Sequence, residues 1–148
     1  MNIEAKYFGN VTYDNDDVIQ ILNGLFGFEE YSQYLCIPFQ EDDSAMLSLQ
    51  SLDDENLSFV LMDPFTLVSD YALTLSAQDK KELEINDNND NLACYVICVI
   101  RDSVAASTVN LKAPLAINTV SNKAKQIMLE NTEYTFRHEL GGLMKKED

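Results

Sequence analysis

His138 is the only histidine of this 148-residue chain, and it is the first candidate for general acid–base chemistry. A catalytic histidine acts on a serine or cysteine held within hydrogen-bond reach, and a third group orients the ring. No nucleophile-elbow sequence of the G-x-S-x-G type occurs in the chain. We therefore expect His138, which follows Arg137, to be a structural hydrogen-bonding residue and the protein not to be an enzyme.

Three acidic clusters are candidates for a cation site. An EF-hand loop needs glycine at its sixth position and glutamate at its twelfth, with a helix on either side, and no cluster has that glycine. In strand–turn–strand settings, Asp and Asn side chains bond nearby backbone without any ion. We expect no metal and no cofactor, with a calcium-dependent binder as an alternative. The clusters are Asp14 to Asp17, Asp53 to Glu55 and Asp87 to Asp90.

A second alternative is a hydrolase that uses paired carboxylates. Such an enzyme needs two carboxyl groups that converge in a pocket with separated pKa values. Acidic residues are so abundant in this chain that the sequence does not single out one pair.

Two further segments have phenylalanine next to acidic residues in predicted loops or turns. The stretch Gly24 to Glu30 has two glycines but no lysine, so it is not a phosphate-binding P-loop. Phe28, Glu29 and Glu30 on such a loop suit a contact with another protein, and a core-plugging Ω-loop is the alternative. Pro64 cannot donate a ladder hydrogen bond, so a strand should end at Asp63-Pro64-Phe65. Phe65 then belongs either to the core or to an apolar patch for a partner.

The charge balance narrows the class of partner. The chain has 25 acidic and 10 basic residues, a formal net charge of -15. Nucleic-acid binding draws much of its affinity from lysine and arginine, so we expect no direct nucleic-acid partner and no anionic membrane partner. A basic protein would be attracted, and salt would weaken that attraction. The alternative is that the acidity serves solubility alone.

Short apolar runs rich in β-branched and aromatic residues dominate the chain. One helix is predicted over residues 77–84, where Ser76 and Asp79 form a capping-box pattern. The cluster from Asp53 to Asn56 predicts a hairpin turn. Together these features predict a mostly β fold, an antiparallel barrel-like single domain with one short helix. The predicted strands are 2–8, 11–13, 18–22, 34–38, 46–52, 57–62, 71–75, 92–100, 107–112, 115–119 and 125–129.

The chain reads as one domain over residues 1–140 with a flexible tail at 141–148. The N-terminus lacks the apolar core of a signal peptide, and the longest apolar run, 92–100, has the length of a strand. Cys94 and Cys98 should share one face of that strand. Cys36 leaves the cysteine count odd, and free buried thiols fit a reducing cytoplasm.

Several of these segments, in order along nearly the whole chain, resemble the bacterial FliW family. Each motif alone is modest, and together they are specific. Two positions depart from the family pattern, which usually has proline in place of Phe26 and often in place of Glu139. The matching stretches are Ile3 to Gly9, Gly24 to Glu29, Leu49 to Asp54 with Leu57 and Phe59, Asp63 to Phe65, Asn110 to Asn118, Gln126 with Leu129, and Tyr134 to His138.

The resemblance implies a compact, mostly antiparallel barrel-like fold and a cytoplasmic protein of flagellum biogenesis. It implies two protein partners, flagellin and the translational regulator CsrA. In that scheme the free protein holds CsrA off flagellin messenger RNA, and accumulating flagellin captures it and releases CsrA. A flagellin-specific cytoplasmic chaperone without CsrA binding is the alternative function.

The residues expected to contact the basic regulator are acids and aromatics on the resembling loops. CsrA-type proteins bind RNA and so need a basic surface, which acidic loops attract and aromatic side chains anchor. The predicted contact residues are Phe28, Glu29, Glu30, Asp53, Asp54, Glu55, Asp63 and Phe65.

Overall fold

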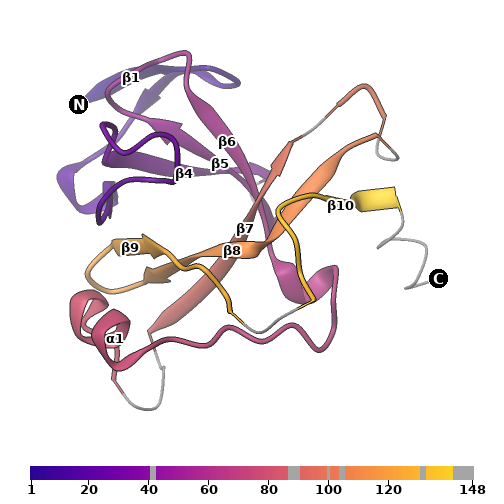
Figure 1. Cartoon of the computed structure of the whole chain (residues 1–148). Helices are drawn as coiled ribbons and strands as arrows, with labels where there is room; N and C mark the ends of the chain where they lie inside the picture. The colour runs from indigo at the N-terminus through magenta and orange to yellow at the C-terminus, as the bar shows by residue number, and fades with distance from the viewer. Residues whose placement is uncertain (41–42, 87–90, 100, 104–105, 131–132, 142–148) are drawn as a thin grey trace.

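A computed structural model describes residues 1–40, 43–86, 91–99, 101–103, 106–130 and 133–141. Within these residues the chain forms ten strands, one α-helix and two short 3-10 helices (Figure 1). In chain order they are β1 (Asn2–Ala5), β2 (Gly9–Thr12), η1 (Asn15–Asp17), β3 (Ile19–Ile21), β4 (Gln33–Gln40), β5 (Asp43–Ser51), β6 (Ser58–Met62), η2 (Pro64–Thr66), α1 (Ala77–Leu83), β7 (Leu92–Val99), β8 (Thr108–Asn118), β9 (Lys123–Gln126) and β10 (His138–Glu139).

Seven strands close into a barrel. Their order is β8-β7-β6-β5-β4-β3-β9, and a further pairing of β8 with β9 joins the two ends. The neighbours are antiparallel except for β3 and β9, which run parallel. The β1–β2 hairpin forms a separate two-stranded sheet, and β10 pairs with the first residues of β8. The predicted mostly β barrel with one helix is confirmed.

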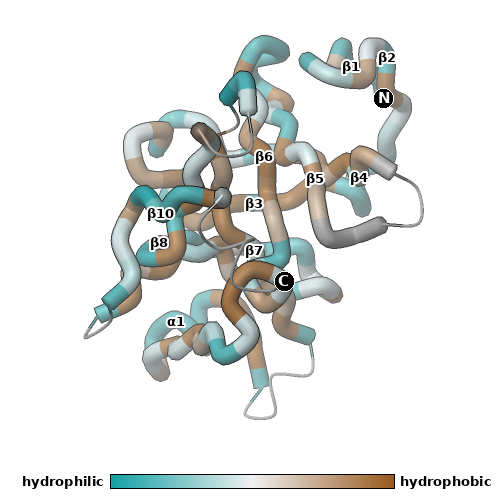
Figure 2. Tube along the Cα trace, turned by 90° about the vertical axis from the view of Figure 1, so that its right-hand side faces the viewer, coloured by the Kyte–Doolittle hydropathy of each residue, from teal (hydrophilic) through white to brown (hydrophobic). Residues whose placement is uncertain are grey.

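Where another segment of the chain covers the outside of the barrel, the strands are buried on both their inner and their outer faces. Successive side chains of a strand point to opposite faces, so Leu61 packs inside the barrel and Val60 packs outside. Figure 2 shows hydrophobic stretches along β3 and β5 to β7, with polar residues in the connections. The barrel core consists of Ile19, Ile21, Leu25, Tyr34, Leu47, Leu49, Leu61, Leu115, Ile117 and Ala124.

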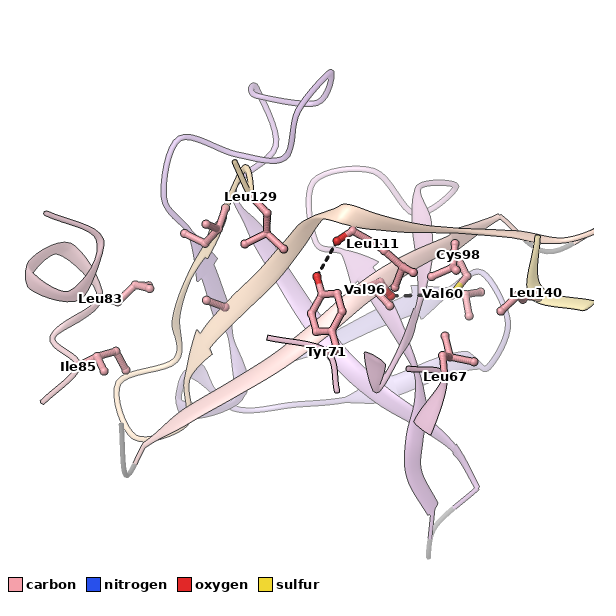
Figure 3. Packing of buried hydrophobic residues seen from close by; sticks show 13 residues of the cluster. Val60, Leu67, Tyr71, Leu83, Ile85, Val96, Cys98, Leu111, Leu129 and Leu140 are labelled. Carbon is pink, nitrogen blue, oxygen red and sulfur yellow. Dashed lines mark hydrogen bonds between the residues drawn. The ribbon is translucent and has the colours of Figure 1, made fainter. Parts of the chain in front are cut away.

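The outer cluster lies between the barrel and the segment that follows β6. Leu67 and Tyr71 from this segment pack on the outward faces of β6, β7 and β8, and Leu83 and Ile85 continue the cluster at α1, which contacts β9 (Figure 3). Residues 71–75, predicted as a strand, are not in one. They are instead part of this covering segment, whose apolar side chains are buried against a sheet face without joining the hydrogen-bond ladder of the sheet. The interpretation of these residues as an apolar run is therefore right, and the prediction that they pair as a strand is wrong.

The long strand β8 joins two strands that the sequence predicted as separate. Pro114, which lies between the two predicted strands, is at a bulge, where the pairing with β7 shifts between Tyr95 and Ile97. The Asn110 side chain accepts hydrogen bonds from the backbone N–H groups of Lys112 and Ala113 there. A bulge tolerates proline because one of its residues needs no ladder partner, so the strand continues through it.

The predicted helix is confirmed, with its capping box. The Ser76 hydroxyl accepts from the Asp79 N–H at 3.0 Å, and the Asp79 carboxylate accepts from the Ser76 N–H at 3.2 Å. Lys125 of β9 ties the helix to the barrel through Asp79 at 2.7 Å and Glu82 at 2.8 Å. Glu84 ends the helix in the left-handed conformation.

The remaining expectations concern the tail, the cysteines and the membrane. Apart from Gly141, the predicted tail 141–148 lies outside the described residues and stays a prediction. Cys94 and Cys98 share the outer face of β7, as predicted, and Cys98 is buried there. In the described part of the chain, no helix is long and apolar enough to cross a membrane.

Candidate protein-binding site

The turn between β5 and β6 presents the acidic cluster Asp53 to Glu55, and a buried glutamine shapes it. Gln50 is fully buried, and its Nε2 lies 3.1 Å from the Glu55 carbonyl and 3.2 Å from the Leu57 carbonyl. Its Oε1 accepts from the backbone N–H of Lys6 at 2.8 Å, which joins the turn to the connection between β1 and β2. Because the buried amide of Gln50 makes most of the side-chain bonds to this turn, the exposed carboxylates of Asp53 and Glu55 are available for a partner.

Ser51 fixes the first half of the same turn. Its buried hydroxyl oxygen accepts from the N–H groups of Asp53 and Asp54, each at 3.1 Å. The Asp54 carboxylate in turn accepts from the Asn56 N–H at 2.9 Å. These local bonds are the Asx- and Ser-type turn chemistry expected from the sequence. The predicted hairpin turn is confirmed.

The glycine-containing loop 22–32 lies over one end of the barrel. Leu25 is buried in the barrel core, and the Phe26 N–H donates to Oε1 of the buried Gln126 at 2.7 Å. Gly24 has a φ of +68°, and a Cβ atom there would lie 2.5 Å from the Cα of Glu29. The loop therefore folds tightly on itself and is attached to the barrel at two points, as the core-plugging alternative predicts. Its contact with another protein stays a prediction.

This loop displays two phenylalanines and one ordered carboxylate. Phe26 is 47% exposed, and Phe28 is 37% exposed while its ring meets Phe59 of β6 edge-on at 5.1 Å. The Glu29 carboxylate accepts from the Gly27 N–H at 3.1 Å, and backbone hydrogen bonds lower its pKa. Glu29 is therefore ionised at neutral pH beside an exposed aromatic surface.

Tyr34 links this loop to the acidic turn. Its ring lies 6.3 Å from the ring of Phe59, which also contacts the ring of Phe28. In the sheet, Tyr34 is the cross-strand neighbour of Ser51, at the start of the turn. Burial, then the nearby Asp53 and Tyr31, raise the pKa of Tyr34 to about 12. The loop 22–32 and the turn 52–57 thus meet at one end of the barrel, which we call the acidic end.

Asp63 and Phe65 lie at the opposite end of β6. This strand has five residues, so it separates them from the acidic turn by roughly 17 Å. In Figure 1 it leads from the side of the N-terminal hairpin to the turn of η2. The Asp63 carboxylate caps η2 by accepting from the Phe65 N–H at 2.9 Å. The eight predicted contact residues therefore do not form one surface.

A row of aromatic rings marks this second end, which we call the tyrosine end. Phe65 is 47% exposed and meets Tyr71 at 6.0 Å, and Tyr71 meets Tyr134 at 5.0 Å. The buried Tyr71 hydroxyl donates to the Leu111 carbonyl at 2.7 Å (Figure 3). His138 adjoins Tyr134 at 6.1 Å, and its Nε2 accepts from the Thr135 N–H at 2.8 Å, which is the structural kind of role expected for it.

Each end carries a groove. The groove at the acidic end has a volume of about 460 Å³, and its lining includes Tyr13, Asp53 and Glu55. The groove by the tyrosine end has a volume of about 690 Å³ and is lined by residues of 72–79, by 127–130 and by Tyr134. Within the described residues, no three His, Cys, Asp or Glu side chains come together in a way that could hold a metal ion. The cluster at 87–90 lies outside them.

Six of the predicted contact residues, Phe28 to Glu30 and Asp53 to Glu55, are thus brought to one end. Sequence reasoning missed the residues beneath them, Gln50 and Tyr34, because both are polar or amphipathic side chains inside apolar strands. Gln50 was within a resembling motif, which was the one available signal. Phe26 was noticed only as a departure from a pattern, although it is the more exposed phenylalanine of the loop.

Comparison with known proteins gives one consistent result. The family model described as "FliW protein" matches residues 2–140. The flagellar assembly factor FliW of Ruminiclostridium cellulolyticum is 34% identical over 148 residues, which covers 100% of this chain and 99% of that protein. The protein of the same name from Thermoanaerobacter pseudethanolicus is 38% identical over 138 residues, covering 93% of this chain and 91% of its own length. A crystal structure of the flagellar assembly factor FliW superposes with a TM-score of 0.86 at 31% identity, over 95% of this chain and 96% of that one.

Proposed function

This chain belongs to the FliW family of flagellar assembly factors, and from that premise we propose that it works by binding two proteins in turn. It binds the translational regulator CsrA and keeps it from repressing flagellin messenger RNA. Flagellin is the competing partner, so accumulating flagellin displaces CsrA. The protein acts in the cytoplasm, as a binding protein and not as an enzyme.

The observation that carries the CsrA proposal is the construction of the acidic end. Carboxylates of the turn lie at the same end of the barrel as two exposed phenylalanines, and the buried amide of Gln50 holds the backbone of the turn in place. A protein that binds RNA needs lysine and arginine on its surface. Opposite charge speeds the encounter of two such surfaces, and aromatic side chains supply the buried contact.

The contact with CsrA is assigned to the six predicted residues of this end. Phe28 anchors it, and Glu29 and Glu30 flank the ring on the loop. Asp53, Asp54 and Glu55 supply the facing charge from the turn. The net charge of -15 supports the same assignment, because the whole molecule attracts a basic partner.

A flagellin chaperone that never binds CsrA is the second candidate. The tyrosine end favours it, because Phe65 and Phe136 are about half exposed and Met128 is 42% exposed beside the larger groove. Exposed apolar side chains around a groove suit an apolar helical or extended segment. Binding through such contacts alone depends little on salt.

The experiment that tests the proposal is a titration of this protein with the CsrA and the flagellin of its own organism, at low and high salt. We expect CsrA to bind, to bind more weakly at high salt, and to be released when flagellin is added. Binding of flagellin alone, unchanged by salt, favours the chaperone function. Binding of neither protein contradicts both.

A further inference from the structure

We propose that the hydroxyl of Tyr34 and the carboxylate of Asp53 form a subsite at the acidic end that receives the guanidinium group of an arginine side chain. The inference rests on the proposed function, since it names the group by which a basic partner is recognised there. It assigns a binding role to a side chain that is buried in the barrel core.

Tyr34 has an unusual environment for a buried tyrosine. The residue is 0% exposed, and among the buried side-chain atoms that the structure describes its hydroxyl is the one without a hydrogen-bond partner. A buried hydroxyl without a partner destabilises the fold. Phenylalanine would fill the same space without that cost, so packing gives no reason for the oxygen atom.

The surroundings of the hydroxyl select the class of ligand. Asp53 lies two residues beyond Ser51, the cross-strand neighbour of Tyr34, and its N–H donates to the Ser51 hydroxyl, so Asp53 is at the same end of the barrel as Tyr34. An ionised carboxylate only accepts hydrogen bonds. The hydroxyl has two lone pairs of its own. A guanidinium group carries five N–H donors in one plane, so a single group can donate to the hydroxyl oxygen and to a carboxylate oxygen together. A group that only accepts hydrogen bonds can bind neither lone pair.

The aromatic residues around this point favour the same ligand. Phe28 meets Phe59 edge-on, and Phe59 adjoins Tyr34, so a chain of rings leads from the surface to the ring of Tyr34. Phe28 is partly exposed, and we expect an incoming arginine to displace its ring and to lie against the aromatic faces. Guanidinium groups pack well on such faces.

The test uses the full chain with tyrosine labelled at ¹³Cζ, which reports on each phenol by NMR. The chain has seven tyrosines, and the Tyr34 signal is assigned by its loss in Tyr34→Phe. N-acetyl-arginine amide is the probe, with the citrulline amide as its uncharged analogue and the lysine amide as a second cation. We expect a saturable shift of the Tyr34 signal with the arginine probe and none with citrulline. No shift, or an equal shift with citrulline or with lysine, overturns the assignment.

Two variants add a readout that does not depend on the signal of Tyr34. Asp53→Asn should weaken binding of the arginine probe about tenfold, which is the scale of one hydrogen bond to a charged group. Binding is followed by the signals of the remaining tyrosines and of methyl groups. Asp16→Asn is the matched control, because it removes one exposed carboxylate elsewhere. Tyr34→Phe should fold normally and lose the probe to a similar extent. Unchanged affinity in both Asp53→Asn and Tyr34→Phe contradicts the subsite.

The two proposals fail separately. A chain that binds CsrA but ignores the arginine probe contradicts the subsite alone. A chain that binds the probe at Tyr34 but not CsrA contradicts the proposed function and leaves the subsite standing as a guanidinium site.

Discussion

The two ends of β6 are built on buried tyrosines in opposite situations. At the tyrosine end the Tyr71 hydroxyl donates to the Leu111 carbonyl at 2.7 Å, and its ring packs between Phe65 and Tyr134. At the acidic end the Tyr34 hydroxyl has no partner among the described groups, and the polar bonds of that end go to the turn instead. Both residues are almost completely buried, at 4% and 0% exposure.

This contrast separates a part that stabilises the fold from a part suited to recognition. Satisfied polar groups in a packed layer contribute to stability, while unsatisfied ones cost stability and persist where function uses them. The covering segment from Leu67 to Ile85 accordingly packs on the barrel through apolar side chains, with one group of ion pairs at α1. The acidic end carries exposed rings and free charge.

The largest expected effect comes from removing the amide that shapes the acidic end. In Gln50→Leu the Lys6 N–H and the carbonyls of the turn lose their partner inside the protein, so the free energy of unfolding should fall by about 3 kcal/mol. Urea denaturation measures it. Gln78→Leu, on the exposed face of α1, is the matched control with little change expected. Equal losses in both variants would show that Gln50 does not shape the turn.

Charge reversal compares the two ends directly. Asp53→Lys with Asp54→Lys should weaken CsrA binding by more than about tenfold, or about 1.4 kcal/mol, because it places two positive charges against a basic partner. Asp63→Lys with Asp70→Lys makes the same charge change at the tyrosine end and should alter the Kd by less than about threefold. Calorimetric titration gives both values. The reverse ranking would move the CsrA site to the tyrosine end.

The two tyrosines predict opposite signs for the same substitution. Tyr71→Phe leaves the Leu111 carbonyl without its partner and should lower the free energy of unfolding by about 1.5 kcal/mol. Tyr34→Phe removes an unsatisfied hydroxyl and should raise it by about 1 kcal/mol. Chemical denaturation of the two variants beside the parent chain decides the point. A loss of stability in Tyr34→Phe would mean that its hydroxyl is bonded in solution.

The smallest effect concerns pH and α1. Burial raises the pKa of Asp79, but hydrogen bonds from Lys125 and Ser76 outweigh this and the pKa is lowered overall. A carboxyl whose pKa is lower in the folded state stabilises the fold above its unfolded pKa, near 3.8, and loses this contribution as pH falls through the folded value. Acid should therefore loosen α1, while the Gln50 network, which has no titrating group, stays intact.

Amide hydrogen exchange at pH 7 and at pH 2.5, below the unfolded pKa of Asp79, checks this after correction for intrinsic rates. Protection of α1 should drop while that of the Lys6 amide, which donates to Gln50, holds. Lys125→Met should lower stability by about 0.5 kcal/mol at neutral pH, the range of partly exposed ion pairs, and by less in acid. A pH-independent effect of this substitution would assign it to packing.

Much of the fold was predictable because short-range sequence patterns specify its strands and its helix. Short apolar runs rich in β-branched and aromatic residues located most strands to within a few residues, and the Ser76–Asp79 pair located the helix. The errors arose where the same local pattern fits two tertiary outcomes. Residues 71–75 are apolar enough for a strand but cover a sheet face, and the two apolar runs 107–112 and 115–119 form one strand with a bulge.

The sequence by itself determined the composition of the site: the acidic charge, the aromatic loop and the polar turn that carry the proposed contacts. Only the tertiary structure decided which of them meet. Asp63 and Phe65 resemble the other contact residues in type, yet β6 sends them to the other end of the barrel. Tyr34 and Tyr71 lie in similar apolar surroundings, and whether each hydroxyl finds a carbonyl depends on residues far along the chain. Leu111 is 40 positions from Tyr71, and no local pattern specifies that distance in space.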